Sequence, residues 1–380
     1  MMYTVETVDS VTLLNKDEWD AIGDSPLSSY GWLRTVEETY TGSIDRRYIV
    51  VKNRQKIVGG AICSIAREKD KFAYVDSELL GRLKKFTAKV GVSFLPALVC
   101  GCTGEHLLIE KGLKDTKEHV IIKDLILDAI VDEAGKHRLP ICFPYLRDNE
   151  QNLMDILKQK GFSHTPVAPY LYIDIEWTSF EEYLNSLRGI SKKIKQSFTK
   201  EIRINEREGV KIESVKEPGK YADRLYDLIN NHYLKHSGVP FKFKKEFIAK
   251  VQEYTGQDCT FYIAWKNDFI TATSFVLRKN STLYVCITAV DRELAGKDMT
   301  FFIMSFHRPM IDAITHGIKR IDKGLGMIEM KTRRGCKVGN QFFFYKPSNK
   351  LSDIAIKLWF VFLSKYYQKK NALSSKNISK

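Results

Sequence analysis

The chain of 380 residues is long enough to bury a large core, and its length favours two domains over one. Sixty Lys and Arg against 46 Asp and Glu leave a formal net charge of +14. This charge favours anionic partners such as nucleic acid, phosphorylated cofactors or acidic lipid headgroups, although solubility alone would also explain it.

Seven scattered cysteines do not form a dense disulfide framework, and they suit a reducing compartment. The first residues lack the apolar segment of a signal peptide, and no apolar run approaches the roughly 20 residues of a membrane span. We therefore expect a cytoplasmic protein, with peripheral attachment at the inner membrane face as an alternative.

In the first half of the chain, strand-like runs alternate with segments of helical period, which is typical of an α/β or α+β protein. The pattern predicts, in order, a helix over 28–40, a hairpin over 46–66, a strand over 97–102, a helix over 117–138 and a strand over 140–146.

Two prolines before the strand-like run at 170–175 place a domain boundary near residue 170. The second half then repeats the order of the first. Its pattern predicts a helix over 179–208, a helix over 221–236, strands within 259–290, a helix over 298–318 kinked at Pro309, and a last strand over 340–345. We expect domains at 1–170 and 171–350, followed by a helix and basic tail at 351–380. The shared order indicates duplication, and chance likeness of two α/β halves remains the alternative.

The second half contains the stretches "FYIAWKNDFITATSFVLRKNSTLYVCITAVDRE" and "AITHGIKRIDKGLG", followed by "MKTRRG". These stretches resemble the FemAB-like branch of the GNAT N-acyltransferase superfamily. The family's Asp-x-Gly element and its later Lys and Gly match Asp322, Gly324, Lys331 and Gly335. Together with "WDAIGDSPLSSYGWLRTV" and "SFEEYLNSLRGISKKIKQS", the resemblance covers roughly residues 18–345. It implies two tandem GNAT-like domains, each a mixed twisted sheet flanked by helices, and transfer of an acyl or aminoacyl group to an amine.

The resemblance places Asp322 at a strand end, where a carboxylate could accept a proton from an incoming ammonium or orient it. Gly324 would let the backbone approach a ligand. Lys331, Arg333 and Arg334 could hold a phosphate or carboxylate. We predict Asp322 and Lys331 as catalytic residues; a strand-end acid bonded to turn N–H groups and a solvated basic loop are the alternatives.

We expect the acyl donor to contact two basic sites: a basic ridge on the helix between the halves, and one position of the loop that binds coenzyme A in the family. The ridge contributes Arg188, Lys192 and Lys195, and "RELAGKDM" matches the family's pyrophosphate loop only at Arg292. The donor is therefore an acyl carrier acting as co-substrate, with aminoacyl-tRNA or acyl carrier protein slightly favoured over coenzyme A, and no cofactor is bound permanently. The ridge could equally be a solvated face.

Two histidines in "NHYLKH" have the spacing that metal ligands use, but a third ligand is missing from the motif. We therefore predict no metal, and assign His232 and Tyr233 to substrate binding. No phosphate loop of a nucleotide hydrolase and no nucleophile elbow of a serine hydrolase occurs.

The C-terminal segment 351–380 predicts an aromatic helix with a basic tail. It either packs on the second domain, contacts an anionic membrane, or forms an oligomer contact. Taken together, the sequence favours an N-acyltransferase that forms an amide bond in a cell-wall precursor or peptide-like metabolite. The alternative is a catalytically silent GNAT scaffold that binds nucleic acid or envelope components.

Overall fold

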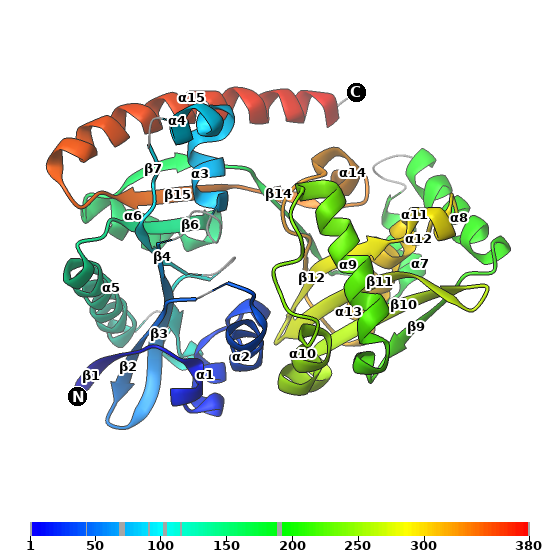
Figure 1. Ribbon diagram of the computed structural model, residues 1–380, viewed down its shortest axis with the longest axis horizontal. Helices are drawn as coiled ribbons and strands as arrows, with labels where there is room; N and C mark the ends of the chain where they lie inside the picture. Colours follow the sequence, from blue (N-terminus) through cyan, green and yellow to red (C-terminus); the bar gives the residue numbers. More distant parts are fainter. Residues whose placement is uncertain are drawn as a thin grey trace. The chain divides into compact units, whose positions relative to one another are not determined.

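The computed structural model describes residues 2–42, 44–67, 73–89, 92–101, 105–114, 116–187 and 192–378. These residues form two compact units whose segments interleave along the chain (Figure 1). Unit 1 comprises Met1–Tyr30, Gly42–Pro169 and Gly339–Lys380, and unit 2 comprises Gly31–Thr41 and Tyr170–Val338.

This division differs from the expected domain ranges at two segments. Residues 31–41 belong to unit 2, where Trp32 of helix α2 (Tyr30–Thr39) packs its ring edge-on against Phe247, with centroids 6.1 Å apart. Residues 339–380 belong to unit 1, because the strand expected to close the second sheet joins the first sheet instead.

The sheet of unit 1 is mixed and has the order β1-β2-β3-β4-β6-β15-β7, with β5 beside β3. Strands β4 and β6 run parallel. The hairpin predicted over 46–66 is present as β2–β3 and turns between Asn53 and Lys56. The strands are β1 (Tyr3–Val8), β2 (Arg46–Asn53), β3 (Lys56–Ala66), β4 (Ala97–Cys100), β5 (Leu108–Ile109), β6 (Ile141–Arg147), β7 (Ser163–Pro166) and β15 (Gln341–Lys346).

Helices cover this sheet through apolar residues at helical spacing. In the longest internal helix, Ile122, Ile126 and Ile130 recur every fourth residue and all lie in the core with sheet residues such as Ile49 and Phe143. The helices are α1 (Lys16–Ile22), α3 (Ala73–Leu80), α4 (Lys84–Lys89), α5 (Lys117–His137), α6 (Gln151–Gln159) and α15 (Lys350–Ile378).

The C-terminal helix α15 docks on unit 1, so the expectation that it packs on the second domain is wrong. The indole Nε1–H of Trp359 donates to the carbonyl of Leu79 at 2.7 Å, and Phe360 and Leu363 are buried. Figure 1 shows the orange-to-red α15 beside the cyan α3. The reason is that β15 has already placed the chain in the sheet of unit 1 when α15 begins.

The sheet of unit 2 is also mixed and has the order β14-β8-β13-β12-β11-β10-β9. The strands predicted within 259–290 are present as β10, β11 and β12, which pair antiparallel in sequence order. The strands are β8 (Tyr170–Asp174), β9 (Lys211–Val215), β10 (Cys259–Lys266), β11 (Phe269–Lys279), β12 (Thr282–Val290), β13 (Arg320–Asp322) and β14 (Lys337–Gly339).

The single helix expected over 179–208 is two helices, α7 and α8, whose shared apolar stripe buries Tyr183, Leu187 and Phe198. Residues 188–191, between the two helices, lie outside the described residues. Besides α2, the helices of unit 2 are α7 (Phe180–Ser186), α8 (Lys192–Arg207), α9 (Ala222–Ser237), α10 (Phe247–Thr255), α11 (Arg292–Ala295), α12 (Thr300–Phe302), the π-helix η9 (Ile303–His307), α13 (Arg308–Thr315) and α14 (Ile328–Thr332).

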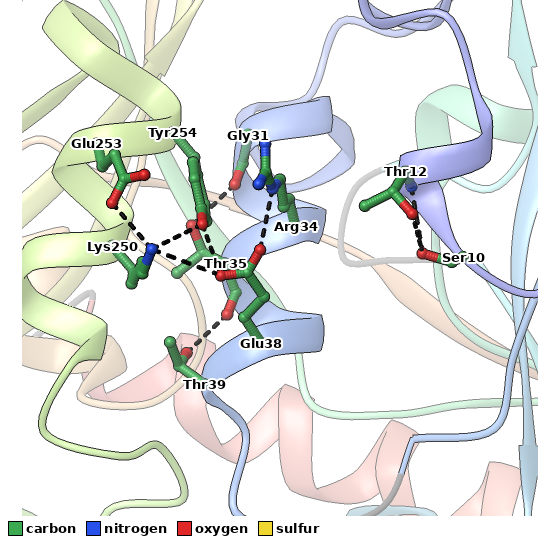
Figure 2. A network of polar contacts seen from close by, with 10 residues as sticks. All are labelled: Ser10, Thr12, Gly31, Arg34, Thr35, Glu38, Thr39, Lys250, Glu253 and Tyr254. Carbon is green, nitrogen blue, oxygen red and sulfur yellow. Dashed lines mark hydrogen bonds and ion pairs between the residues drawn. The ribbon is translucent and has the colours of Figure 1, made fainter.

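Helices α2 and α10 approach closely and share a polar network (Figure 2). A Cβ at Gly31 would lie 2.3 Å from the carbonyl oxygen of Tyr254, so only glycine permits this approach. The hydroxyl of Tyr254 donates to Glu38 at 2.6 Å and accepts from Lys250 at 2.9 Å, while the Arg34 guanidinium lies 4.1 Å from the ring centroid of Tyr254. The phenol of Tyr254 therefore contacts charged side chains of both helices.

Replacing Tyr254 by phenylalanine removes this hydroxyl and keeps the ring. We expect the free energy of unfolding to fall by about 1 kcal/mol, because Glu38 and Lys250 lose a shared partner at a half-buried site. Urea denaturation followed by circular dichroism measures the change. The exposed Tyr366 provides the matched control, and Tyr366→Phe should change stability by less than about 0.5 kcal/mol. Equal effects of the two substitutions would contradict the role of the network.

Within the described residues, no helix is long and apolar enough to cross a membrane.

Candidate active site

A gap opens in the sheet of unit 2 where two parallel strands part. Strands β12 and β13 pair from Thr282–Arg320 to Tyr284–Asp322, where β13 ends, whereas β12 continues to Val290. Beside the gap, β12 carries a bulge: Val276 pairs with Val285 and Phe275 with Ile287, which leaves Cys286 as an extra residue. Bulges of this kind re-aim backbone groups and often lie next to active sites.

A cavity of about 380 Å³ occupies this gap. One wall is β12 beyond the last paired residue, a second is α9, and a third is formed by α12 and η9. The lining residues are His232, Tyr233, His236, Ser237, Val285, Cys286, Ile287, Thr288, Phe301, Ser305, Phe306, Lys323, Met327, Met330 and Lys331. All of them belong to unit 2.

The π-helix η9 at the cavity has a cause in the sequence. Pro309 has no N–H to donate to the carbonyl four residues earlier, which is that of Ser305. The predicted disruption at Pro309 is therefore present as a π-turn over Ile303–His307. The carbonyl of Ser305 accepts a hydrogen bond from the ammonium of Lys323. A helix irregularity thus provides the partner of a buried lysine.

Lys323 is a strongly perturbed ionisable group that lines the cavity. Burial lowers its pKa to about 7 from an ordinary 10.5, and the positive charges of Lys331 and Arg334 act in the same direction. Its Nζ lies 4.3 Å from the ring centroid of Phe306. Near neutral pH the amine therefore exchanges readily between its charged and neutral forms, as a group that moves a proton requires.

The two residues predicted as catalytic hold the loop that follows β13. The Lys331 ammonium donates to the carbonyls of Lys323 at 2.6 Å and Leu325 at 2.7 Å, and burial lowers its pKa. Asp322 is 2% exposed, and its Oδ1 accepts the Gly324 N–H at 2.8 Å. Asp322 is thus bonded to a turn N–H, as its alternative reading expected, while Lys331 lines the cavity.

Gly324 lies in this loop with φ of +62°, a conformation that L side chains rarely adopt. A Cβ there would lie 3.5 Å from the hydroxyl oxygen of Tyr284 on β12. The glycine therefore serves the turn that places Lys323 in the cavity.

A second cavity of about 600 Å³ shares five lining residues with the first. The shared residues are His232, His236, Phe301, Met327 and Met330. It also reaches Lys235 and the loop after β12, where it is lined by Asp291, Arg292 and Glu293. The Asp291 carboxylate caps α11 and forms an ion pair with Arg224 at 2.8 Å. Asp291 is therefore engaged by groups other than Lys235 and Arg292, the two basic residues that line this cavity.

Four predicted site residues thus line these cavities: His232, Tyr233, Lys331 and Arg292. Burial lowers the pKa of His232, and the neighbouring His236, whose ring centroid is 4.5 Å away, acts in the same direction. A neutral His232 can donate and accept hydrogen bonds.

Other predicted residues are placed elsewhere. Arg333 is exposed and pairs with Glu329 at 2.6 Å, and Arg334 forms a buried ion pair with Glu201. Lys195 is bonded to Glu181 and Asn185, 3.1 and 2.5 Å away, rather than extended from a ridge. Lys192 begins α8, and Arg188 lies outside the described residues.

Sequence reasoning missed Lys323, Ser305 and Phe306. The signals were present, because Lys323 directly follows the predicted strand-end acid and Pro309 marks the carbonyl that becomes available. In the described part of the chain, no three His, Cys, Asp or Glu side chains are grouped to hold a metal ion.

Unit 1 contains the corresponding pair of parallel strands, but a side chain occupies the place where they part. Strands β4 and β6 pair over Leu98–Ile141 and Val99–Cys142. The ring of His106 then binds the carbonyl of Pro144 at 2.7 Å, and a Cβ on Gly101 would lie 2.2 Å from the same ring. Burial opposes the charged form of His106, but the adjacent Glu150 carboxylate raises its pKa.

The comparison with known families decides the relationship. The FemAB-like family, described as acting in peptidoglycan biosynthesis and recognition, matches residues 10–372. The chain belongs to the FemAB-like family. This match confirms the resemblance that the sequence showed. A comparison with curated proteins found no match.

Solved structures similar to this FemAB-like protein share its fold at low identity. A crystal structure of FemX is 12% identical with a TM-score of 0.61, and the match covers 92% of this chain and all of that one. The C-terminal domain of a putative lysylphosphatidylglycerol synthetase from Agrobacterium fabrum is 11% identical with a TM-score of 0.56, covering 89% and 92%.

A conserved protein of unknown function from Bacteroides thetaiotaomicron is 12% identical with a TM-score of 0.56. The match covers 90% of this chain and all of that one. The predicted fold class is confirmed in that the FemAB-like chain contains two mixed sheets flanked by helices, a fold it shares with FemX. Its family supports transferase chemistry in general terms.

Proposed function

We propose that this protein transfers an acyl or aminoacyl group from a phosphate-bearing carrier to an amine in the cavity of unit 2. The observation that carries the proposal is the parting of β12 and β13 around a cavity that contains Lys323. In the reaction a C–N bond forms, the bond from the carbonyl carbon to the carrier oxygen or sulfur breaks, and one proton passes from the amine to the leaving carrier.

The backbone of β12 can stabilise the oxyanion of this reaction. Beyond Tyr284 the pairing with β13 ends, and the residues around the bulge, Val285 to Thr288, line the cavity. Fixed N–H groups aimed at a developing negative charge contribute strongly in a water-poor site. A donor carbonyl lying along Val285–Thr288 would be held in this position.

Lys323 is suited to accept a proton from the amine nitrogen as it attacks the carbonyl, and to pass that proton to the leaving carrier. Its pKa of about 7 makes a neutral amine abundant at neutral pH, while its bond to the Ser305 carbonyl fixes the position of Nζ. Lys331 and Asp322 then support catalysis by holding the loop through Lys323, Leu325 and Gly324. Their direct participation stays a prediction.

The second cavity is the proposed site for the phosphate of the carrier. Arg292 and Lys235 both line it, and guanidinium groups bind phosphate through two parallel hydrogen bonds. Aminoacyl-tRNA, acyl carrier protein and coenzyme A all supply such a phosphate, so the chemistry of this site is common to the three donors.

Replacing Arg292 by alanine should raise the apparent KM for the donor about 10-fold and leave kcat nearly unchanged, because one charge-assisted contact to a bound anion is lost. Steady-state kinetics with each donor class measures this change. The exposed Lys216 lies outside both cavities, so Lys216→Ala serves as the control for a lost positive charge. An unchanged KM would remove Arg292 from the donor site.

The acceptor is proposed to be an amine of a cell-wall precursor or of a peptide-like metabolite, in line with the description of the family. Incubation of the full chain with amine acceptors and pools of charged tRNA, acyl carrier protein and acyl-coenzyme A tests it, with mass spectrometry of the products. An amide formed from one donor class identifies the carrier. Absence of product from every pool, together with salt-dependent RNA binding, would favour the non-catalytic scaffold instead.

A further inference from the structure

Helix α15 has two apolar faces, and the described residues of the chain cover one of them. The inner face places Phe360, Leu363 and Tyr367 in the core with α3, where the Tyr367 hydroxyl donates to the carbonyl of Glu78 at 3.2 Å. The residues of the opposite side, defined here as the outer face of α15, are Ile354, Leu358, Val361, Phe362 and Tyr366.

The outer face of α15 consists of large apolar side chains that are exposed. Leu358 is 70% exposed and Phe362 is 57% exposed, and the positions follow the helical period over residues 354–366. Docking of the helix on unit 1 needs only the inner face, so it does not explain these residues. Contiguous exposed apolar surface of this kind marks an interaction site.

The chain next to α15 adds a second set of exposed apolar residues. The carbonyl of Leu79, at the end of α3, accepts the bond from Trp359 of α15. The chain then continues directly into η3 (Gly81–Leu83) and α4, where Leu83 is exposed and Phe86 is 65% exposed. Two neighbouring helical segments of unit 1 therefore present large apolar side chains to the surroundings.

The sequence of the segment that contains the outer face of α15 is rich in positive charge. From Ile354 to the end of the chain there are six lysines and no acidic residue. The acid just before this stretch, Asp353, is paired with Lys357 at 2.5 Å. Lys365 lies within the outer face of α15, and Lys89 is exposed at the end of α4. A lysine among apolar residues can keep its ammonium at a polar boundary while its methylene chain contacts apolar groups.

We propose that the outer face of α15, with Leu83 and Phe86, docks this protein on the surface of an anionic phospholipid bilayer. Aromatic and aliphatic side chains interleaved with lysines suit the boundary between headgroups and acyl chains, where apolar burial and attraction to anionic lipid act together. In this arrangement α15 lies along the membrane surface, with its inner face still packed on unit 1. The inference does not depend on the proposed transfer reaction.

Flotation of the full chain with vesicles tests this surface. Vesicles of phosphatidylcholine mixed with phosphatidylglycerol should carry the protein, and pure phosphatidylcholine vesicles should carry far less. The variant Phe86→Gln/Leu358→Gln/Phe362→Gln should lower the partition coefficient at least about 10-fold, since three exposed apolar groups no longer enter the boundary. Raising the salt concentration should weaken the binding of the wild-type chain.

Phe269 provides the matched control, because it is 62% exposed on unit 2, and Phe269→Gln should leave flotation unchanged. Equal flotation of the triple variant and the wild type would overturn the proposal, as would failure of the wild type to bind the anionic vesicles. A dimer in sedimentation velocity that the triple variant dissociates would assign the surface to a second copy instead. The vesicles contain no amine acceptor or acyl donor, so flotation measures membrane binding alone and does not depend on whether the protein has transfer activity.

Discussion

Replacing Lys323 by methionine should lower the rate of acyl transfer at least about 100-fold, because the reaction loses a positioned group that accepts a proton. Methionine keeps the length and apolar body of the side chain, so the cavity wall formed with Phe306 is retained. Single-turnover rates with a donor that the wild type uses measure the loss. Lys319→Met, four residues earlier at an exposed position, is the matched control and should retain the wild-type rate.

The pH dependence separates this role from a structural one. Only the neutral amine accepts a proton, so the wild-type rate should rise with pH up to about 7 and then level off. The Lys323→Met variant should lose this inflection. A variant that keeps both the rate and the inflection would exclude Lys323 from the chemistry.

The stability of the same variant gives an independent measurement. The pKa of Lys323 in the folded chain, about 7, lies below its ordinary value of 10.5, so between these two pH values the unfolded chain binds more protons. Wild-type stability should therefore rise with pH across this window, and the methionine variant should lack that rise. At pH 7 the variant should be at least as stable as the wild type, which shows that lost activity is not lost folding.

Replacing Glu201 by alanine should lower the free energy of unfolding by about 3–5 kcal/mol. The Glu201 carboxylate is buried, binds the guanidinium of Arg334, and lies 3.1 Å from Nε2 of His307. Arg334 lies against the rings of Phe302 and Phe306, at 4.4 and 5.0 Å, and cannot reach water without moving them. Removal of the Glu201 carboxylate therefore leaves the guanidinium of Arg334 as an unpaired buried charge.

Urea denaturation of Glu201→Ala beside Glu206→Ala measures this effect. Glu206 lies on the same helix but is exposed, so its removal should cost less than about 0.5 kcal/mol. Glu201→Gln keeps the side-chain volume and should lie between the two. A Glu201→Ala variant as stable as the Glu206→Ala control would show that Arg334 is not held by this ion pair.

Much of the local structure of this protein was predictable because its patterns are strong. The hairpin over 46–66, the helix over 117–138 and the three strands within 259–290 are present as β2–β3, α5 and β10–β12. Alternation and helical period act over a few residues, and turn residues mark their ends. The helix over 179–208 was split in the structure, because two short helices share one apolar stripe and periodicity does not reveal the break between them.

The assignment of segments to sheets was not predictable in the same way. The aromatic strand β15 reads as the end of the second half, yet it pairs with β6 and β7 of unit 1, and α15 follows it there. Any apolar strand can pair with any open strand edge, and the choice depends on which edge is free in three dimensions.

The candidate site shows the same division between sequence and structure. The sequence by itself determined the family, the order of elements, and the position of the loop around Asp322 and Lys331, because these depend on residue types at fixed spacing. Only the tertiary structure decided that Lys323 faces the cavity with a lowered pKa and that Arg334 is committed to Glu201. Burial and the partner of each charge arise from segments far apart in the chain, and these two quantities decide whether a basic residue moves a proton or holds the fold.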